Sequence, residues 1–196
     1  MIGPVWRGWG LFLLLAVAML LLQLAGEPAR ALLRFEREAV LAGEFWRLLT
    51  AHLVHLGWAH CLLNLAGLLL CRLLCPELFR DRRWLPALLV LMAGTGILLL
   101  VAAPQVADYV GFSGVLYGLF LLGLWPQLRR GDRIALLALG ILAGRALWQL
   151  LAGASVEEEG MIGGRIIAEA HVFGMLVASG WLAVRALLQE RRTAST

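Results

Sequence analysis

The sequence predicts an all-helical membrane protein that crosses the bilayer several times, and three observations support that fold class. First, 61% of the 196 residues are hydrophobic, and the mean hydropathy is +0.84, whereas soluble domains are about 45–50% apolar. Second, apolar runs recur at the length of about 20 residues that a helix needs to cross the hydrocarbon core. Third, every basic residue is an arginine, and the arginines gather between those runs. The net charge of +4 therefore reflects membrane topology, and no nucleic-acid partner is expected.

Six spans are expected within a single domain that covers residues 1–196, with no room for a separate soluble domain. The first span, residues 9–25, lacks a convincing signal-peptidase site, so we expect it to be retained. Residues 27–57, called the first loop below, form the longest stretch between spans, and their apolar pairs predict short amphipathic helices at the interface. The remaining spans are expected over residues 58–75, 84–103, 112–127, 134–151 and 167–188.

The arginines also predict the orientation of these spans. They lie in alternate loops and at both ends, as Arg7, Arg80–Arg83, Arg129–Arg133 and Arg191–Arg192. Residues 104–111 have no arginine, and residues 152–168 have one beside a run of glutamates. Because cytoplasmic loops are enriched in arginine, both termini are expected in the cytoplasm. The arginines of the first loop depart from this pattern.

This orientation brings polar side chains from three spans to one side of the membrane. The second, fourth and sixth spans all begin at the outer side. His60 and Asn64 lie in the first two turns of the second span, Ser113 begins the fourth, and His171 lies near the start of the sixth. At a rise of ~1.5 Å per residue, all four lie within about 10 Å of one boundary.

Ser113 stands between Gly111 and Gly114, where an irregular stretch runs into the fourth span. Alone, this pattern is more typical of close helix packing. A serine becomes a nucleophile when a base accepts its proton, and histidine is the usual base, which His171 supplies. The start of a helix also favours developing negative charge. Tyr117 follows one turn later on the same helix face, where it can stack against His171.

His60 and Asn64 are four residues apart, so their side chains point the same way. Their donors can stabilise an oxyanion, although hydrogen bonding between helices explains such a pair equally well. Glu169 is an acid at membrane depth, which is costly and suggests a function. Because it lies two residues from His171, it faces away from that histidine, and we expect it to bind substrate or to hold the neighbouring loop through Arg165.

That loop, residues 153–165, overlies the predicted site and is called the cap below. Its glycines predict mobility, and Met161 with Ile162 predicts an apolar tip that enters the cavity. The run Glu157–Glu159 is expected to be a solvated face.

The sequence also bears on other classes of function. His52, His55 and His60 suggest a metal site, but they lack cysteine or carboxylate partners at familiar spacing, so neither a metal nor another cofactor is expected. A transporter would show internal repeats and broken helices at the midplane, and the sequence has no such repeat. A non-catalytic membrane binding protein remains the alternative of another class, although it would be expected to lack the serine or the histidine.

Taken together, these motifs resemble the rhomboid intramembrane serine proteases over nearly the whole chain, in the family's order. The resemblance implies a six-helix rhomboid bundle with a partly submerged first loop, in which Trp46 and Arg47 stabilise the fold. It implies that Ser113 is the nucleophile, that His171 is the general base and that Tyr117 packs on that histidine. It also implies an oxyanion hole formed by His60, Asn64 and the Ser113 backbone N–H. The motifs that carry it are Gly111-Phe112-Ser113-Gly114 with Tyr117, Ala170-His171-Val172-Phe173-Gly174, His60-Cys61-Leu62-Leu63-Asn64, and Trp46-Arg47 followed by Thr50, His52 and His55.

Within that family the chain is similar to the rhombosortase branch, because it is compact and has Glu169-Ala170-His171 where many rhomboids have Gly-Ala-His. This branch implies a monomeric catalytic unit in the bacterial inner membrane with its site toward the periplasm. The substrates would be exported, membrane-anchored proteins with a C-terminal tail: a Gly-Gly-type motif, an apolar span and basic residues. Hydrolysis and acyl transfer both stay open, as does a general rhomboid protease of single-span proteins. Phe112 and Phe173 are bulky and are expected to narrow the site for small residues.

Overall fold

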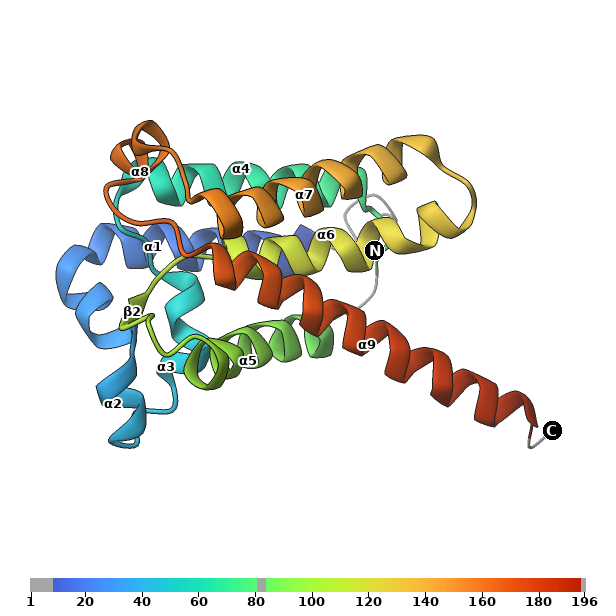
Figure 1. Cartoon of the computed structure of the whole chain (residues 1–196), viewed down its shortest axis with the longest axis horizontal. Coiled ribbons are helices and arrows are strands. Elements are labelled where there is room, and N and C mark those ends of the chain that lie inside the picture. Colours follow the sequence, from blue (N-terminus) through green and yellow to red (C-terminus); the bar gives the residue numbers. More distant parts are fainter. Residues whose placement is uncertain (1–8, 81–83, 195–196) are drawn as a thin grey trace.

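The computed structural model describes residues 9–80 and 84–194, and helices make up most of this part of the chain (Figure 1). A helix covers most of each of the six ranges expected to span the membrane, and the remaining elements lie mainly in the first loop and the cap. Arg7, Arg82 and Arg83, which were used to orient the chain, lie outside the described residues. The elements in chain order are α1 (Trp9–Leu33), β1 (Phe35–Glu36), α2 (Arg37–Leu41), α3 (Arg47–Thr50), the 3-10 turn η2 (Ala51–Leu53), α4 (Trp58–Leu74), α5 (Trp84–Ala102), β2 (Asp108–Tyr109), α6 (Ser113–Arg129), α7 (Arg133–Ala152), α8 (Val156–Ile162) and α9 (Ala168–Ala194).

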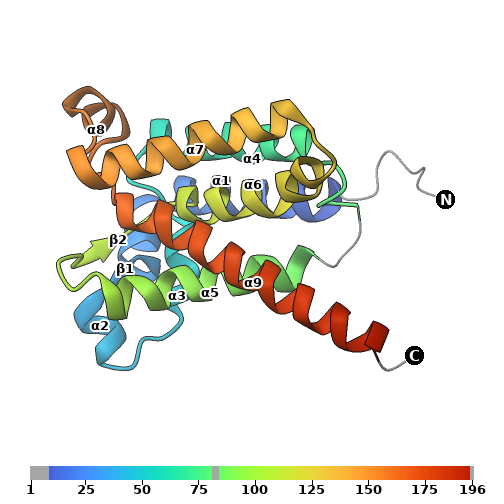
Figure 2. The same ribbon diagram turned by 45° about the vertical axis from the view of Figure 1, so that its right-hand side comes forward.

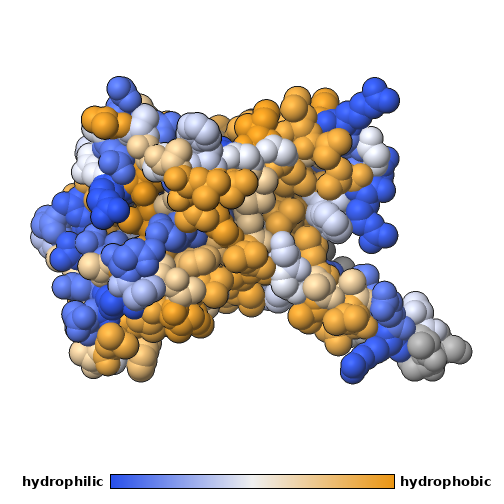
Figure 3. Space-filling view, viewed as in Figure 1, coloured by the Kyte–Doolittle hydropathy of each residue, from blue (hydrophilic) through white to orange (hydrophobic). Residues whose placement is uncertain are grey.

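Four of the described helices are long and apolar enough to cross a membrane, namely Phe12–Leu33, Trp84–Ala102, Arg133–Ala152 and Ala168–Arg191. A fifth span results if Arg47–Leu53 and Trp58–Leu74, which meet at 92°, are taken together. An apolar band crosses the middle of the molecule between two hydrophilic ends, as Figure 3 shows. The chain is therefore a multi-pass membrane protein. A sixth span would be α6, whose 17 residues make it shorter than the other candidates.

Helix α6 lies at the centre of the bundle, where it packs against α4, α5, α7 and α9 (Figures 1 and 2). Residues 114–120 and 122–124 are buried along it. Neighbouring helices surround α6, so it packs against protein on several sides. A helix in this position is apolar all round and has no separate polar face, as the sequence of α6 shows.

The contact between α6 and α9 is unusually close because glycines face each other across it. A Cβ atom on Gly114 would lie 2.7 Å from the Ala170 carbonyl oxygen, and one on Gly118 would lie 2.8 Å from the Gly174 carbonyl oxygen. A Cβ atom on Gly174 would overlap the Gly114 carbonyl. Small residues let helix backbones approach in this way, and the approach brings the starts of α6 and α9 together.

The first loop begins with a helical piece. Helix α1 is broken at Gly26, whose φ of 65° and ψ of −141° are non-helical, and a second helical piece continues through Pro28 to Leu33. Two short strands then pair, with Phe35 opposite Tyr109 and Glu36 opposite Asp108. Strands of two residues leave no alternation in the sequence, so this pairing could not be predicted.

Three of the four arginines of the first loop donate to backbone carbonyls, which gives them a structural role apart from topology. Arg30 donates to the Leu56 carbonyl at 2.5 Å. Arg47, only 6% exposed, donates to the Ala31 and Arg34 carbonyls at 2.9 and 2.8 Å. Arg37 closes the end of α5 by donating to four carbonyls at 2.6–3.0 Å, those of Leu99, Leu100, Ala103 and Val106.

Trp46 and Thr50 add to these attachments. The Trp46 indole donates to the Leu32 carbonyl at 3.3 Å, although this side chain is 46% exposed. The Thr50 hydroxyl donates to the Leu33 carbonyl at 2.8 Å. These hydrogen bonds attach the later part of the first loop to its own beginning, at the end of α1. Those of Arg37 attach the loop to the end of α5.

Candidate active site

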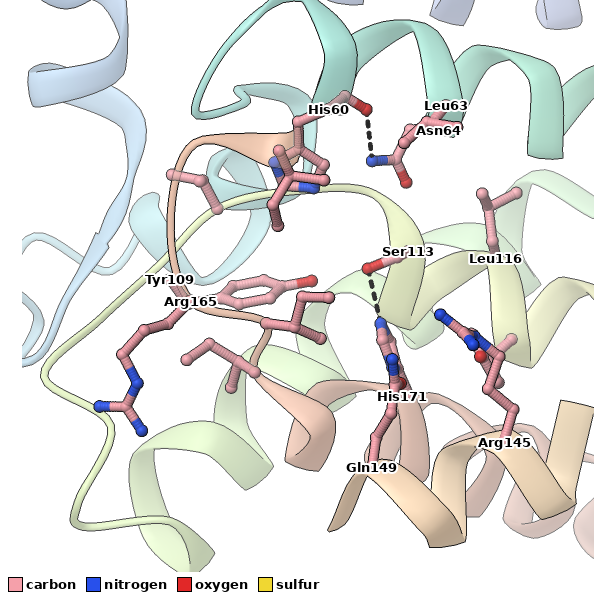
Figure 4. A pocket seen from close by; sticks show the side chains of 15 residues that line it. His60, Leu63, Asn64, Tyr109, Ser113, Leu116, Arg145, Gln149, Arg165 and His171 are labelled. Atoms are coloured by element: carbon pink, nitrogen blue, oxygen red, sulfur yellow. Dashed lines mark hydrogen bonds between the residues drawn. The ribbon is translucent and has the colours of Figure 1, made fainter. Parts of the chain in front are cut away.

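Ser113 and His171 face each other across the contact between α6 and α9. Ser113 is the first residue of α6 and His171 lies in the first turn of α9. The Ser113 Oγ and the His171 Nε2 are 2.9 Å apart (Figure 4). His171 is 7% exposed, so little solvent competes for its ring nitrogens. This is the arrangement in which a histidine can accept the proton of a serine hydroxyl.

The Tyr117 ring lies flat against the imidazole of His171. The two ring centroids are 4.5 Å apart and the planes differ by 11°. Tyr117 reaches this position because it follows Ser113 by one helical turn and so shares its helix face. The contact holds the plane of the imidazole so that its edge points at Ser113.

Gln149 is a third partner of this pair, and the sequence reasoning missed it. Its Oε1 lies 3.0 Å from His171 Nδ1, and its side chain is 4% exposed. A signal was present in the sequence: Gln149 is a polar residue in an apolar segment, close to the outer end of the fifth span. Gln149 lies at the same depth as Ser113, but on a span that ends at the outer side instead of beginning there.

His60 and Asn64 lie on α4 across the cavity from His171 (Figure 4). The Leu56 N–H points at His60 Nδ1 at 3.4 Å, which leaves Nε2 as the protonated nitrogen. A Cβ atom at Gly111 would lie 2.7 Å from His60 Nε2, so only glycine allows the two to approach. Asn64 Nδ2 donates to the His60 carbonyl at 3.0 Å and keeps its second N–H. Both side chains can therefore offer an N–H to the cavity.

Tyr109 fixes the turn that precedes Ser113. Its hydroxyl donates to the Gly111 carbonyl at 2.6 Å, and Gly111 has a φ of 117°, which favours glycine. Burial raises the pKa of the Tyr109 phenol, so the phenol keeps the proton that it donates. No motif in the sequence pointed to this tyrosine, because it stands on a strand that the sequence did not predict.

The cavity between these side chains has a volume of about 200 Å³. Its walls combine the polar groups above with apolar side chains and two arginines. The other lining residues are Leu63, Val110, Leu116, Arg145, Ile162, Arg165, Ile166 and Ile167.

The cap contains helix α8 and contributes one apolar side chain to the cavity. Ile162 is 8% exposed and lines the cavity, but Met161 is 55% exposed and does not. The prediction that both would form an inserted tip is therefore wrong for Met161, because neighbouring residues of a helix point in different directions. The predicted solvated face is also partly occupied, since Arg145 of α7 binds Glu158 at 2.6 Å.

Glu169 binds neither Arg165 nor the cavity in the described structure. Its carboxylate accepts from Gln105 Nε2 at 2.6 Å, which joins the start of α9 to the stretch between α5 and β2. Glu169 is absent from the residues that line the Ser113 cavity. The predicted contact with Arg165 is thus replaced by a contact with Gln105.

Phe112 and Phe173 do not narrow the cavity, because neither lines it. Phe112 is fully buried in the core beneath the start of α6. Phe173 packs against a second core cluster that includes Phe35 and Leu99, since a residue two positions after His171 faces another side of α9. Both side chains contribute to packing.

The histidines that suggested a metal have other neighbours. His52 Nε2 lies 2.9 Å from the Met92 carbonyl, and the His55 ring packs edge-on against His60 with centroids 5.0 Å apart. Over residues 9–80 and 84–194, no group of three or more histidines, cysteines and acids converges on one point.

Comparison with known proteins shows which family the chain belongs to. A family model described as the rhomboid domain matches residues 42–189. YdcA, a candidate rhomboid protease of Bacillus subtilis (strain 168), is 31% identical over 140 residues, which cover 69% of this chain and 65% of the relative. The chain thus spans less than two thirds of the length of that relative. The match over most of the chain confirms the resemblance seen in the sequence: the protein belongs to the rhomboid family.

Proposed function

We propose that this protein is an intramembrane serine protease that uses Ser113 and His171 as a catalytic dyad. The observation that carries the proposal is the 2.9 Å contact between Ser113 Oγ and His171 Nε2 beside a cavity. Membership of the rhomboid family supports the reaction class. Hydrogen-bond donors on the far wall of the same cavity add the second requirement of acyl chemistry, a place for negative charge.

The reaction begins when Ser113 Oγ attacks the carbonyl carbon of the scissile peptide bond while His171 Nε2 takes the hydroxyl proton. The carbonyl oxygen becomes an oxyanion that can accept from His60 Nε2–H, from Asn64 Nδ2–H and from the Ser113 backbone N–H. As the C–N bond breaks, His171 gives its proton to the leaving amine. An ester between Ser113 and the N-terminal part of the substrate remains.

The second half of the reaction releases that ester. Water attacks the ester carbonyl while His171 takes one of its protons, and the proton then returns to Ser113 Oγ as the C–O bond breaks. The products are a carboxylic acid and the free serine. An amine in place of the water would give a new amide by the same steps, so acyl transfer uses the same dyad.

The substrates in this proposal are exported proteins held in the membrane by a C-terminal tail of the rhombosortase type. The described arginines of the loop between α6 and α7 lie at the end of the bundle opposite Ser113 (Figure 1), which supports a site at the periplasmic side of a bacterial inner membrane. A cavity of about 200 Å³ suits glycine or another small residue at the scissile bond.

Co-expression with a tail-bearing exported protein tests this proposal. The wild type should remove the tail, whereas Ser113→Ala and His171→Ala should leave it in place at equal expression. A matched single-span protein without the Gly-Gly motif serves as the control substrate. Equal cleavage of both substrates would favour a general rhomboid protease, and undiminished tail removal by Ser113→Ala would overturn the serine mechanism.

A further inference from the structure

Helix α7 places one buried amide against the catalytic pair. Gln149 is 4% exposed and lies near the end of a helix composed mainly of apolar residues. An amide buried without hydrogen bonds is costly, and a leucine would fill the same space. Packing alone therefore does not explain why a glutamine occupies this position.

The amide oxygen of Gln149 faces the imidazole of His171. The Oε1 atom lies 3.0 Å from His171 Nδ1, and both side chains are buried.

This orientation decides which nitrogen of His171 carries the proton. The Gln149 oxygen can only accept, so the proton of the neutral imidazole is on Nδ1. The Nε2 atom then keeps its lone pair, and it is this atom that lies 2.9 Å from Ser113 Oγ. The other tautomer would set two acceptors against each other at Gln149 and would leave the serine without a base.

We propose that Gln149 is a positioning residue that holds His171 in the tautomer able to accept the Ser113 proton, a task that a carboxylate performs in a three-membered triad. The inference rests on the proposed function of the Ser113–His171 pair. The Gln149 oxygen also stabilises the imidazolium that forms when the proton arrives, because its dipole points at Nδ1.

A role in packing alone makes the opposite prediction for two substitutions. Gln149→Leu keeps the size of the side chain and removes the acceptor, whereas Gln149→Glu keeps an acceptor and adds a charge. If Gln149 only fills space, leucine should be tolerated better than glutamate. If it positions His171, glutamate should be tolerated better than leucine.

The rate of Ser113 modification by a fluorescent fluorophosphonate measures the readiness of the nucleophile without a known substrate. Full-length variants would be labelled in detergent over a range of probe concentrations, which separates the maximal rate from the half-saturating concentration. Gln149→Leu should lower the maximal rate about 10-fold and change the half-saturating concentration by less than about 2-fold. Gln149→Glu should remain within about 3-fold of the wild type. Leu150→Ala, on the lipid-facing side of the same turn, is the control and should match the wild type.

A second measurement keeps the inference testable if a Gln149 variant folds poorly. In wild-type protein labelled with ¹⁵N-histidine, the His171 resonances should show a protonated Nδ1 and an unprotonated Nε2, with the assignment taken from their loss in His171→Ala. A protonated Nε2 in the wild type would overturn the inference.

The outcomes separate this inference from the proposed function. Labelling of Gln149→Leu at the wild-type rate, while Ser113→Ala stays unlabelled, would overturn the role of Gln149 alone. Equal labelling of the wild type and Ser113→Ala would overturn the serine mechanism and, with it, this inference.

Discussion

The first loop and the cap both lie at the end of the bundle that holds Ser113, but they are fastened in different ways (Figure 1). The first loop is held by arginine side chains that donate hydrogen bonds to backbone carbonyls. Arg37 alone donates four of these hydrogen bonds. The cap is held to α7 by the ion pair of Arg145 and Glu158, whose side chains are 49% and 31% exposed. On the cap helix, Val156 is 82% exposed.

The difference indicates which of the two segments can move. Hydrogen bonds from a charged group to partly buried carbonyls contribute about 1.5–3 kcal/mol each, and losing one leaves the carbonyl unsatisfied. An exposed ion pair contributes about 0–1 kcal/mol. We therefore expect the first loop to stay fixed to the bundle and the cap to open more readily.

Replacing Arg37 should have the largest effect on stability. Arg37→Ala leaves the carbonyls at the end of α5 without their shared donor, and we expect the free energy of unfolding to fall by about 2–4 kcal/mol. Thermal unfolding in detergent, followed by size-exclusion chromatography, measures this. Glu38→Ala, at an exposed position of the same short helix, is the control and should change little. A loss no larger than that of Glu38→Ala would show that the first loop is not fastened by Arg37.

Replacing Arg47 by lysine should have a smaller effect of the same kind. Lysine keeps the charge but lacks the planar fork that lets Arg47 reach two carbonyls and Glu44 together. We expect a loss of about 1–2 kcal/mol with unchanged fluorophosphonate labelling per folded molecule. Normal stability combined with lost labelling would instead give Arg47 a part in the chemistry.

Shortening the cap side chain that enters the cavity should alter access more than stability. Ile162→Ala removes an apolar wall of the cavity, and because a cap can open before the bundle unfolds, the global stability should fall by less than about 1 kcal/mol. The second-order rate of fluorophosphonate labelling should rise about 2–5-fold. Met161→Ala is the matched control, since that side chain points to solvent. A large loss of stability in Ile162→Ala alone would mean that the cap belongs to the rigid core.

The smallest expected effect is a pH-dependent loosening of the cap. The hydrogen bond from Arg145 lowers the pKa of Glu158 below its ordinary value of 4.5. The ion pair therefore stabilises the closed cap above that pH, and its contribution is lost as the pH falls below it. Hydrogen exchange of α8 amides, corrected for the intrinsic pH dependence, should become faster relative to α4 between about pH 5 and about pH 3.

Glu158→Gln supplies the control for this last prediction. This variant lacks the ion pair at either pH, so its α8 amides should exchange at the faster rate relative to α4 at both pH values. A wild-type cap that exchanges as slowly at acid pH as at neutral pH would show that contacts other than the ion pair hold it closed.

Much of the bundle could be predicted from the sequence, because hydropathy and arginine position act over whole segments. Helices lie over every predicted span, and the depth argument selected Ser113, His171, His60 and Asn64 as neighbours. The β1–β2 pairing and the carbonyls bound by Arg37 could not be predicted, because they join residues far apart in the chain through geometry that leaves no period. Helix α1 breaks at Gly26, next to the predicted end of the first span, and the helical piece that follows lies in the first loop, where short helices were expected.

The site was predicted incompletely for a related reason. The four residues selected were those at the starts of spans, so Gln149, at the end of one, was passed over. Phe112 and Phe173 were given a role in the cavity from their place beside Ser113 and His171 in the chain. A helix turns by about 100° per residue, so neighbours in sequence can face different parts of the bundle.

The most direct test of the account is the site and rate of fluorophosphonate modification in the purified protein, read by mass spectrometry of the intact chain and of its fragments. If Ser113 and His171 form a catalytic pair, a single adduct should form on Ser113, be absent in Ser113→Ala and form about 1,000-fold more slowly in His171→Ala. Modification of Ser113→Ala at the wild-type rate, or of His171→Ala at an undiminished rate, would contradict it.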